Sequence, residues 1–190
     1  MKQLENLDTN FIGKNIIFYE DLPSTQALAH KLVLETVPNG TVVITNNQTA
    51  GKGTNDRVWY SSPNTNLTFT IILYPQIDMQ KLEFLALDIA NIITSTFQEL
   101  YNIPLQVKHP NDIICNSKKI GGILTESKTY GNTATSLLIG IGLNINSVEI
   151  DNSIKEIATS LKLEYGRDFN IDFILTNLLN NIEKMYLSHF

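Results

Sequence analysis

The sequence predicts an α+β fold in which a mixed, largely antiparallel sheet is flanked by helices. Short apolar or β-branched segments follow one another with few helices between them, whereas a doubly wound sheet would show regular alternation of strand and helix. The chain contains neither a P-loop nor a G-x-G-x-x-G motif between a strand and a helix. A nucleotide site in this chain would therefore need another design.

The first predicted elements are two strands with a helix between them. Residues 15–19 and 40–46 are apolar or β-branched runs, which are typical of strands. Between them, either Ser24 or Thr25 can cap a helix that begins after Pro23. The sequence thus indicates a strand, a helix and a second strand.

A polar stretch separates this unit from the longest predicted helix. Residues 47–66 are rich in Gly, Asn and Ser, which indicates a long loop, and residues 66–74 form the next strand. From residue 79 to residue 100, apolar side chains recur at three- and four-residue spacing. This spacing predicts an amphipathic helix.

The second half of the chain is expected to supply most of the remaining strands. Residues 105–108, 112–115, 119–126 and 137–144 are strand candidates, and an Asn-Ser turn joins the second to the third. The tail, residues 171–186, again has helical spacing of apolar side chains.

The composition is that of an ordinary soluble globular protein, with 43% hydrophobic and 17% charged residues. The formal net charge of −5 argues against general binding to nucleic acid or to a membrane surface. With a single cysteine, Cys115, neither an internal disulfide nor a cysteine-based metal cluster can form. The N-terminus lacks the apolar run of a signal peptide and no segment is long enough to span a membrane, so a cytoplasmic location is expected.

Two segments in the first half carry more polar and glycine character than packing requires. Ser24-Thr25-Gln26 places two hydroxyls and an amide at a helix start, where a plain N-cap is the simpler interpretation. Residues 48–54 (QTAGKGT) form a glycine loop after a strand. Such a loop can present backbone N–H groups to an anion, but taken alone it is more typical of a flexible surface loop.

Two further segments lie in the second half. In residues 108–112 (KHPND), Asn111 and Asp112 are either ordinary turn residues or ligands for Mg²⁺ and phosphate oxygens. In residues 118–124 (KKIGGIL), a hairpin turn explains the first lysine. It does not explain Gly121-Gly122, because glycine weakens a strand unless something must approach it closely.

Taken in order, these segments resemble the motifs of the biotin–protein ligase family, whose fold is shared with lipoate ligases and class II aminoacyl-tRNA synthetases. The family's S-T-N, Q-T-A-G-R-G-R-x-G-R-x-W, K-W-P-N-D, K-K-I-x-G-I-L-x-E and G-I-G-[IL]-N-x-N patterns occur here in the same order. Their counterparts are Ser24-Thr25-Gln26 and residues 48–59, 108–112, 118–126 and 140–146, and residues 158–161 match a further A-T-S-L pattern. The resemblance spans about residues 16–186, nearly the whole chain.

The resemblance implies a two-step, ATP-dependent ligase reaction. Biotin and ATP first form biotinyl-5′-AMP and pyrophosphate. A lysine of a carrier protein then takes the biotin and releases AMP, and the family suggests the biotin carboxyl carrier protein of acetyl-CoA carboxylase. Lys119 matches the family's essential lysine, which bridges the biotin carboxylate and the α-phosphate. Between two anions its charged form is favoured, so we expect electrostatic stabilisation from Lys119 and not base chemistry.

The resemblance also assigns the binding residues. Trp59 matches the tryptophan that closes the glycine loop, where it is expected to pack as a lid. The expected biotin contacts are Ser24, Thr25, Gln26, Gln48, Gly51, Lys52, Gly53, Thr54, Lys119, Gly121 and Gly122. The expected contacts to ATP and Mg²⁺ are Lys52, Asn111, Asp112, Lys119 and Asn144, with Asp112 as the metal ligand.

The sequence departs from the family patterns at five positions. Lys52 replaces an arginine and keeps the charge without the bidentate fork. Thr54 stands where a second arginine is common, and Asp56 adds negative charge near the phosphates, so the loop is expected to hold the adenylate less firmly. His109 replaces a tryptophan; it either fills the same space or contacts the ligand and makes activity pH-sensitive. Gln26 replaces an asparagine and moves the amide by one methylene.

The resemblance further implies that residues 1–190 form a single catalytic domain. About 15 residues precede the first strand, too few for the helix-turn-helix domain of bifunctional repressor-ligases, so DNA binding is not expected. The chain ends at Phe190, where many relatives continue into an SH3-like domain, which we expect to be absent or truncated. The family leaves both a monomer and a homodimer open.

Two other functions remain open. One is a lipoate or octanoate ligase or transferase of the same fold, for which Cys115 is the only candidate cysteine nucleophile. The other is a non-catalytic module that binds biotin without ATP-dependent release of pyrophosphate.

Overall fold

A computed structural model describes residues 4–190, apart from the side chain of Asp56. Its main sheet contains, in spatial order, β1 (Ile16–Leu22), β2 (Thr41–Gln48), β5 (Leu67–Leu73), β10 (Thr133–Leu143), β9 (Lys118–Tyr130), β8 (Asp112–Cys115) and β7 (Gln106–Lys108). The pair β1–β2 is parallel and the other neighbours in this order are antiparallel. The predicted α+β class with a largely antiparallel sheet is confirmed.

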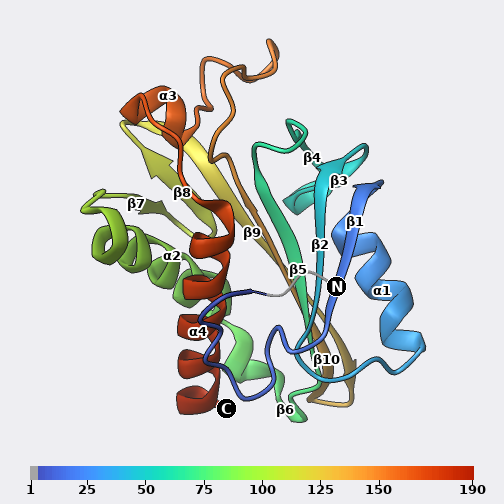
Figure 1. The fold of residues 1–190 in the computed structure, drawn as a ribbon. Helices are drawn as coiled ribbons and strands as arrows, with labels where there is room; N and C mark the ends of the chain where they lie inside the picture. The colour runs from blue at the N-terminus through green and yellow to red at the C-terminus, as the bar shows by residue number, and fades with distance from the viewer. Residues whose placement is uncertain (1–3) are drawn as a thin grey trace.

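Helices cover both faces of this sheet, as Figure 1 shows. The helices α2 (Leu85–Tyr101) and α4 (Ile171–His189) lie on one face, and α1 (Thr25–Leu34) lies on the other. The larger apolar core joins the sheet to α2 and α4, and a smaller cluster packs under α1. A fourth, short helix, α3 (Leu161–Tyr165), precedes α4.

The central strand β5 shows how the two faces divide. All seven of its residues are buried, so burial alone does not distinguish the faces. Phe69 and Ile71 belong to the larger core, whereas Thr68 and Thr70, which alternate with them, line a cavity beside α1. One face of the sheet is therefore closed by helices, and the other is left partly open for a site.

The predicted 47–66 loop is wrong in part. It contains a two-stranded sheet, β3 (Gly51–Lys52) with β4 (Val58–Trp59), which are joined by a 3₁₀ turn at Thr54–Asp56. Polar, glycine-rich composition does not reveal so short a ladder, because two residues per strand give no periodicity. Figure 1 shows this small sheet beside the ends of β2 and β5.

The other predicted elements are present with shifted bounds. The 79–100 helix begins only at Leu85, because residues 79–82 form a separate 3₁₀ turn that Asp78 caps. The strands β9 and β10 extend further toward their shared hairpin than expected, and the start of β10 also pairs with β6 (Ile77–Asp78). None of the helices in the described part of the chain is both long and apolar enough to cross a membrane.

Candidate active site

The start of α1 forms one wall of the cavity beside the sheet. Ser24 is the N-cap, and its hydroxyl accepts from the Ala27 N–H at 3.4 Å, so the plain capping interpretation holds for this residue. The next residue, Thr25, donates to Gln48 Oε1 twice, from its backbone N–H at 2.7 Å and from its hydroxyl at 3.1 Å. Since a backbone N–H can only donate, Gln48 must turn its oxygen toward α1.

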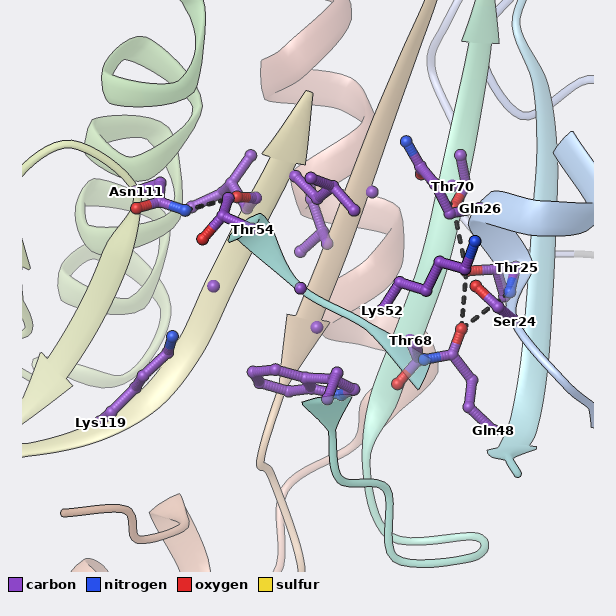
Figure 2. A pocket seen from close by; sticks show the side chains of 18 residues that line it. Ser24, Thr25, Gln26, Gln48, Lys52, Thr54, Thr68, Thr70, Asn111 and Lys119 are labelled. Atoms are coloured by element: carbon purple, nitrogen blue, oxygen red, sulfur yellow. Dashed lines mark hydrogen bonds between the residues drawn. The ribbon is translucent and has the colours of Figure 1, made fainter. Parts of the chain in front are cut away.

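The hydroxyl of Thr70 connects this wall to the sheet. It lies 2.9 Å from Thr25 Oγ1 and 3.1 Å from Gln26 Oε1, and all three residues are buried. Figure 2 shows Ser24, Thr25, Gln26, Gln48, Thr68 and Thr70 gathered on one side of the cavity. This polar end is dense in hydrogen-bonding groups and closed to bulk water, which suits a small polar ring.

The amide of Gln26 is tied to a carboxylate on β9. Its Nε2 donates to Glu126 Oε2 at 2.6 Å, and the same oxygen lies 2.8 Å from His30 Nε2. Gln26 and His30 are four residues apart, so they lie on the same face of α1 and reach the same oxygen. Sequence reasoning gave Glu126 a place in a motif but no role.

Lys119 lies on the opposite side of the cavity, the side on which Asn111 also lies (Figure 2). Its backbone N–H donates to Ile157 O at 2.8 Å, and its carbonyl accepts from the Thr159 N–H at 2.9 Å. Its ammonium group pairs with Asp112 on β8, with 2.6 Å between Nζ and Oδ1. The side chain is 34% exposed, so a ligand can reach the charge.

Two neighbouring cavities meet at this lysine. The inner cavity, of about 50 Å³, runs from the polar end to Lys119, and the outer one, of about 450 Å³, lies beyond it. Four residues line both cavities, namely Gly53, Thr54, Trp59 and Lys119. The inner volume is far below the roughly 300–1,000 Å³ of typical ligand pockets, so a ligand must displace part of the lining or extend into the outer cavity.

Glycines on β9 and β10 make room for the cavity. A Cβ at Gly142 would lie 2.5 Å from the Trp59 ring, and one at Gly140 would lie 2.6 Å from Gln26 Oε1. At Gly122 the nearest atom would be Lys119 Nζ, at 3.3 Å. The indole nitrogen of Trp59 is buried and has no hydrogen-bond partner among the described residues, which fits packing over Gly142.

Two glycines assigned to biotin have other surroundings. A Cβ at Gly121 would point toward the core, 2.4 Å from Leu143 Cδ2, so Gly121 lies on the wrong face of β9 to line the cavity. Strand alternation causes this, because Gly122 already occupies the cavity face. Gly51 is required by the β3–β4 pairing, where a Cβ would meet the Trp59 carbonyl at 2.4 Å, and it lies outside the inner cavity.

The remaining predicted residues divide between the two cavities. Lys52 and Asn111 line the inner one, and Asn111 donates to the Ile123 carbonyl at 2.9 Å. Asn144 lines the outer one with Asp112; it is buried and donates to the Thr159 carbonyl at 3.0 Å. These two amides therefore already hold the backbone around the site. The side chain of His109 is exposed and lies outside the lining of both cavities, so a ligand contact from it gains no support.

Comparison with known proteins decides the family. The profile described as "Biotin/lipoate A/B protein ligase family" matches residues 18–144, well over half of the chain. The chain belongs to this family.

Relatives with assigned names agree with this family membership. The bifunctional ligase/repressor BirA of Bacillus subtilis (strain 168) is 37% identical over 182 residues, which cover 95% of this chain and 56% of that protein. The biotin–protein ligase of Homo sapiens is 30% identical over 192 residues, which cover 95% of this chain and 26% of that protein. This family member thus spans about half the length of the first relative and about a quarter of the second.

Solved structures of family members share the fold. The biotin protein ligase of Aquifex aeolicus in complex with biotin and ATP superposes with a TM-score of 0.79 at 30% identity, covering 92% of this chain and 71% of that one. The Leishmania major enzyme in complex with biotinyl-5-AMP gives 0.74 at 26% identity, covering 92% and 76%. The predicted class II synthetase-like fold of biotin–protein ligases is confirmed.

Several cavity residues of this biotin/lipoate ligase family member were missed from the sequence. Thr68 and Thr70 had a readable signal, because two threonines at a spacing of two within an apolar strand mark one polar face. Gly140 and Gly142 belong to a recognised motif and repeat the same spacing, but the motif alone did not show which face they occupy. Leu124 lines the inner cavity without any sequence signal, since apolar strand residues are common.

Proposed function

We propose that this chain activates biotin with ATP and transfers it to a lysine of a carrier protein. In the first step a biotin carboxylate oxygen attacks the α-phosphorus of ATP, the bond to the β-phosphate breaks, and pyrophosphate leaves. In the second step a carrier lysine amine attacks the acyl carbon of biotinyl-5′-AMP, and AMP leaves as an amide forms. The chain spans only part of the length of its named relatives. We therefore base the proposed activity on the geometry of the site.

The position of Lys119 is the observation that carries this proposal. Its ammonium group lies where the inner and outer cavities meet, which is where the carboxylate of one substrate would meet the phosphate of the other. Two anions repel each other, and a fixed positive charge between them lowers the energy of their approach. Because the lysine backbone is held on both sides by residues 157–159, the charge is positioned before the substrates bind.

The opposite end of the inner cavity favours biotin over lipoate or octanoate. It offers the hydroxyls of Thr25 and Thr70 and the amides of Gln26 and Gln48, all of them buried. These groups already bond one another, but their remaining lone pairs and N–H groups can exchange hydrogen bonds with a ureido ring. An acyl chain or a dithiolane can satisfy none of this remaining capacity. Cys115, the nucleophile that an octanoyltransferase would need, is 1% exposed within the larger core.

The outer cavity suits a nucleotide carried with Mg²⁺. Lys108 and Lys119 provide positive charge, and Ile154 and Ile157 provide an apolar wall. Within residues 4–190 no group of three or more His, Cys, Asp or Glu side chains could hold a metal alone. Mg²⁺ commonly uses one or two carboxylates together with substrate phosphates, so Asp112 fits as the single protein ligand to a metal that arrives with ATP.

The proposed partner is the biotin carboxyl carrier protein of acetyl-CoA carboxylase, and the proposed location is the cytoplasm, where ATP and such a carrier meet. The acidic net charge of −5 supports the expectation that these residues do not bind DNA. A single catalytic domain over residues 1–190, acting as a monomer or a homodimer, is part of the same proposal.

One assay tests the proposal. The chain is incubated with biotin, Mg-ATP and a biotin carboxyl carrier domain, and biotin-dependent pyrophosphate release and carrier biotinylation are measured. We expect both at similar rates for the wild type and for Lys128→Ala, which removes an exposed lysine on the same strand, and both at rates at least about 100-fold lower for Lys119→Ala. Transfer of lipoate in place of biotin would contradict the proposal, and so would biotin binding without pyrophosphate release.

A further inference from the structure

The contact between Gln26 and Glu126 fixes what the deep end of the inner cavity offers to a ligand. An ionised carboxylate only accepts hydrogen bonds, so the amide of Gln26 must turn its Nε2 toward Glu126. Its Oε1 then faces the other way, over Gly140, where a Cβ would lie only 2.6 Å from it. Both Gln26 and Gly140 line the inner cavity.

The hydroxyl chain next to Gln26 leaves that oxygen available. The backbone N–H of Thr25 orients Gln48, so the Thr25 hydroxyl hydrogen is directed to Gln48 Oε1. Thr70 has one hydroxyl hydrogen, and Thr25 Oγ1 at 2.9 Å and Gln26 Oε1 at 3.1 Å compete for it. A carbonyl oxygen has two lone pairs, so Gln26 Oε1 keeps at least one for a ligand.

From these contacts we propose that Glu126, supported by His30, is a positioning and specificity-determining residue that makes Gln26 an acceptor for a ligand N–H. This positioning role rests on the proposed function, because the ligand N–H that Gln26 would accept belongs to the ureido ring of biotin. Glu126 does not touch the ligand and acts only through the orientation of Gln26.

The length of the side chain at position 26 makes this arrangement possible. Gln26 stands where the family pattern has asparagine, and the additional methylene extends the amide toward β9. The side chain of Glu126 is 41% exposed and that of His30 is 43% exposed, whereas Gln26 is 3% exposed. A carboxylate at the surface thus sets which end of a buried amide faces the cavity. A ligand without an N–H donor cannot form a hydrogen bond with the amide oxygen that is presented there.

Biotin affinity in a double-mutant cycle tests this directly. Titration calorimetry with biotin, without ATP, is performed on the wild type, Glu126→Ala, Gln26→Ala and the double variant. We expect Glu126→Ala to weaken biotin binding about tenfold in the wild-type background and to have no further effect when Gln26 is already alanine. Glu126→Gln keeps an acceptor oxygen for Gln26 and should retain most of the affinity, and Glu99→Ala, an exposed glutamate on α2, should bind like the wild type.

Other measurements separate orientation from folding. In steady-state pyrophosphate release, Glu126→Ala should raise the KM for biotin about tenfold and leave kcat within twofold, because Lys119 is untouched. His30→Ala removes the second contact to the carboxylate and should also raise the KM for biotin, by a smaller factor, with kcat nearly unchanged. If Glu126→Ala fails to fold, this variant tests the positioning role in its place.

Each result has one meaning for the proposal. Unchanged biotin affinity in Glu126→Ala, or equal losses in both backgrounds, would overturn the positioning role of Glu126. A wild type that binds no biotin would overturn this role and the proposed function together. A wild type that binds biotin but releases no pyrophosphate would end the proposed function alone, since the calorimetric cycle still decides the role of Glu126.

Discussion

Lys119 Nζ and Asp112 Oδ1 lie 2.6 Å apart, on adjacent antiparallel strands and at the junction of two cavities. The pair gives the lysine a defined position while leaving a third of its side chain accessible. A substrate carboxylate that approaches this ammonium group must share it with Asp112. The ammonium group of Lys119 is therefore positioned before a ligand binds. An anionic substrate can take the place of Asp112 beside it, and a metal ion can take its place beside Asp112.

The role of Lys119 as a fixed charge predicts an ordering of its variants. Lys119→Ala should lower the rate of biotin-dependent pyrophosphate release about 10²–10³-fold. Lys119→Arg should retain about 1–10% of the wild-type rate, because a guanidinium keeps the charge with a different shape. Rates are measured at saturating ATP. Equal losses in the two variants would instead indicate base chemistry, since arginine does not deprotonate.

Trp59, the only tryptophan, predicts a fluorescence difference between two glycine variants. Gly142→Ala places a methyl group 2.5 Å from the indole, so the ring must move, its emission should shift, and stability should fall by about 1–3 kcal/mol. Gly122→Ala is the matched control, because its nearest contact is Lys119 Nζ at 3.3 Å and the indole is 3.7 Å away, an ordinary van der Waals distance. Identical emission spectra for these two variants would show that the ring is not packed on Gly142.

The thiol of Cys115 should be unreactive in the folded chain and should have no role in catalysis. Burial raises the pKa of its thiol, so the reactive thiolate is scarcer in the folded chain than in the unfolded one. We expect no alkylation by iodoacetamide at pH 8 until denaturant is added, and full carrier biotinylation by Cys115→Ala.

The same pKa shift has a definite sign for stability. A thiol pKa that is raised on folding contributes stability that is present below the unfolded pKa and is lost as the pH rises through the folded one. Urea unfolding of the wild type and Cys115→Ala should therefore differ in pH dependence only under alkaline conditions. Rapid labelling of the native chain at pH 8 would contradict both expectations.

Glu183 predicts a large effect on stability far from the cavity. Its carboxylate on α4 is 3% exposed and accepts from the backbone N–H groups of Asn10, Phe11 and Ile12. Glu183→Ala leaves these donors without a partner, so we expect a loss of about 3 kcal/mol and a Tm about 6–12 °C lower. Lys184→Ala, at the exposed neighbouring position, should change the Tm by less than about 2 °C. Calorimetry measures both, and similar Tm values would contradict the role of Glu183.

The sheet and the long helices could be predicted because their periodicity is local. Residues 85–101 show helical spacing and β5 shows a run of apolar and β-branched residues, and both are elements of the structure. The β3–β4 ladder and the five-residue α3 could not be predicted, since so few residues carry no period. The start of α2 was placed too early because a 3₁₀ turn and an α-helix share similar apolar spacing.

The sequence predicted many of the residues of the candidate site, but not the face of the strand on which each one lies. Ser24, Thr25 and Gln48 were assigned together from ordered motifs, and the structure brings their side chains to one wall. Gly121 and Gly122 looked equivalent, yet strand alternation sends one to the core and the other to the cavity. The contact from Gln26 to Glu126 joins residues a hundred positions apart, which no local pattern can reveal.

The hydrogen bonds from residues 157–159 to Lys119 impose an order on how the site can assemble. The polar end of the inner cavity draws on β5, α1 and the glycines of β10, all of which precede residue 144. A chain emerging from the ribosome can therefore close that end while the lysine still lacks the backbone that holds it. Only after residues 157–159 have left the exit tunnel can the Lys119 backbone form the two hydrogen bonds that hold it opposite that end of the site.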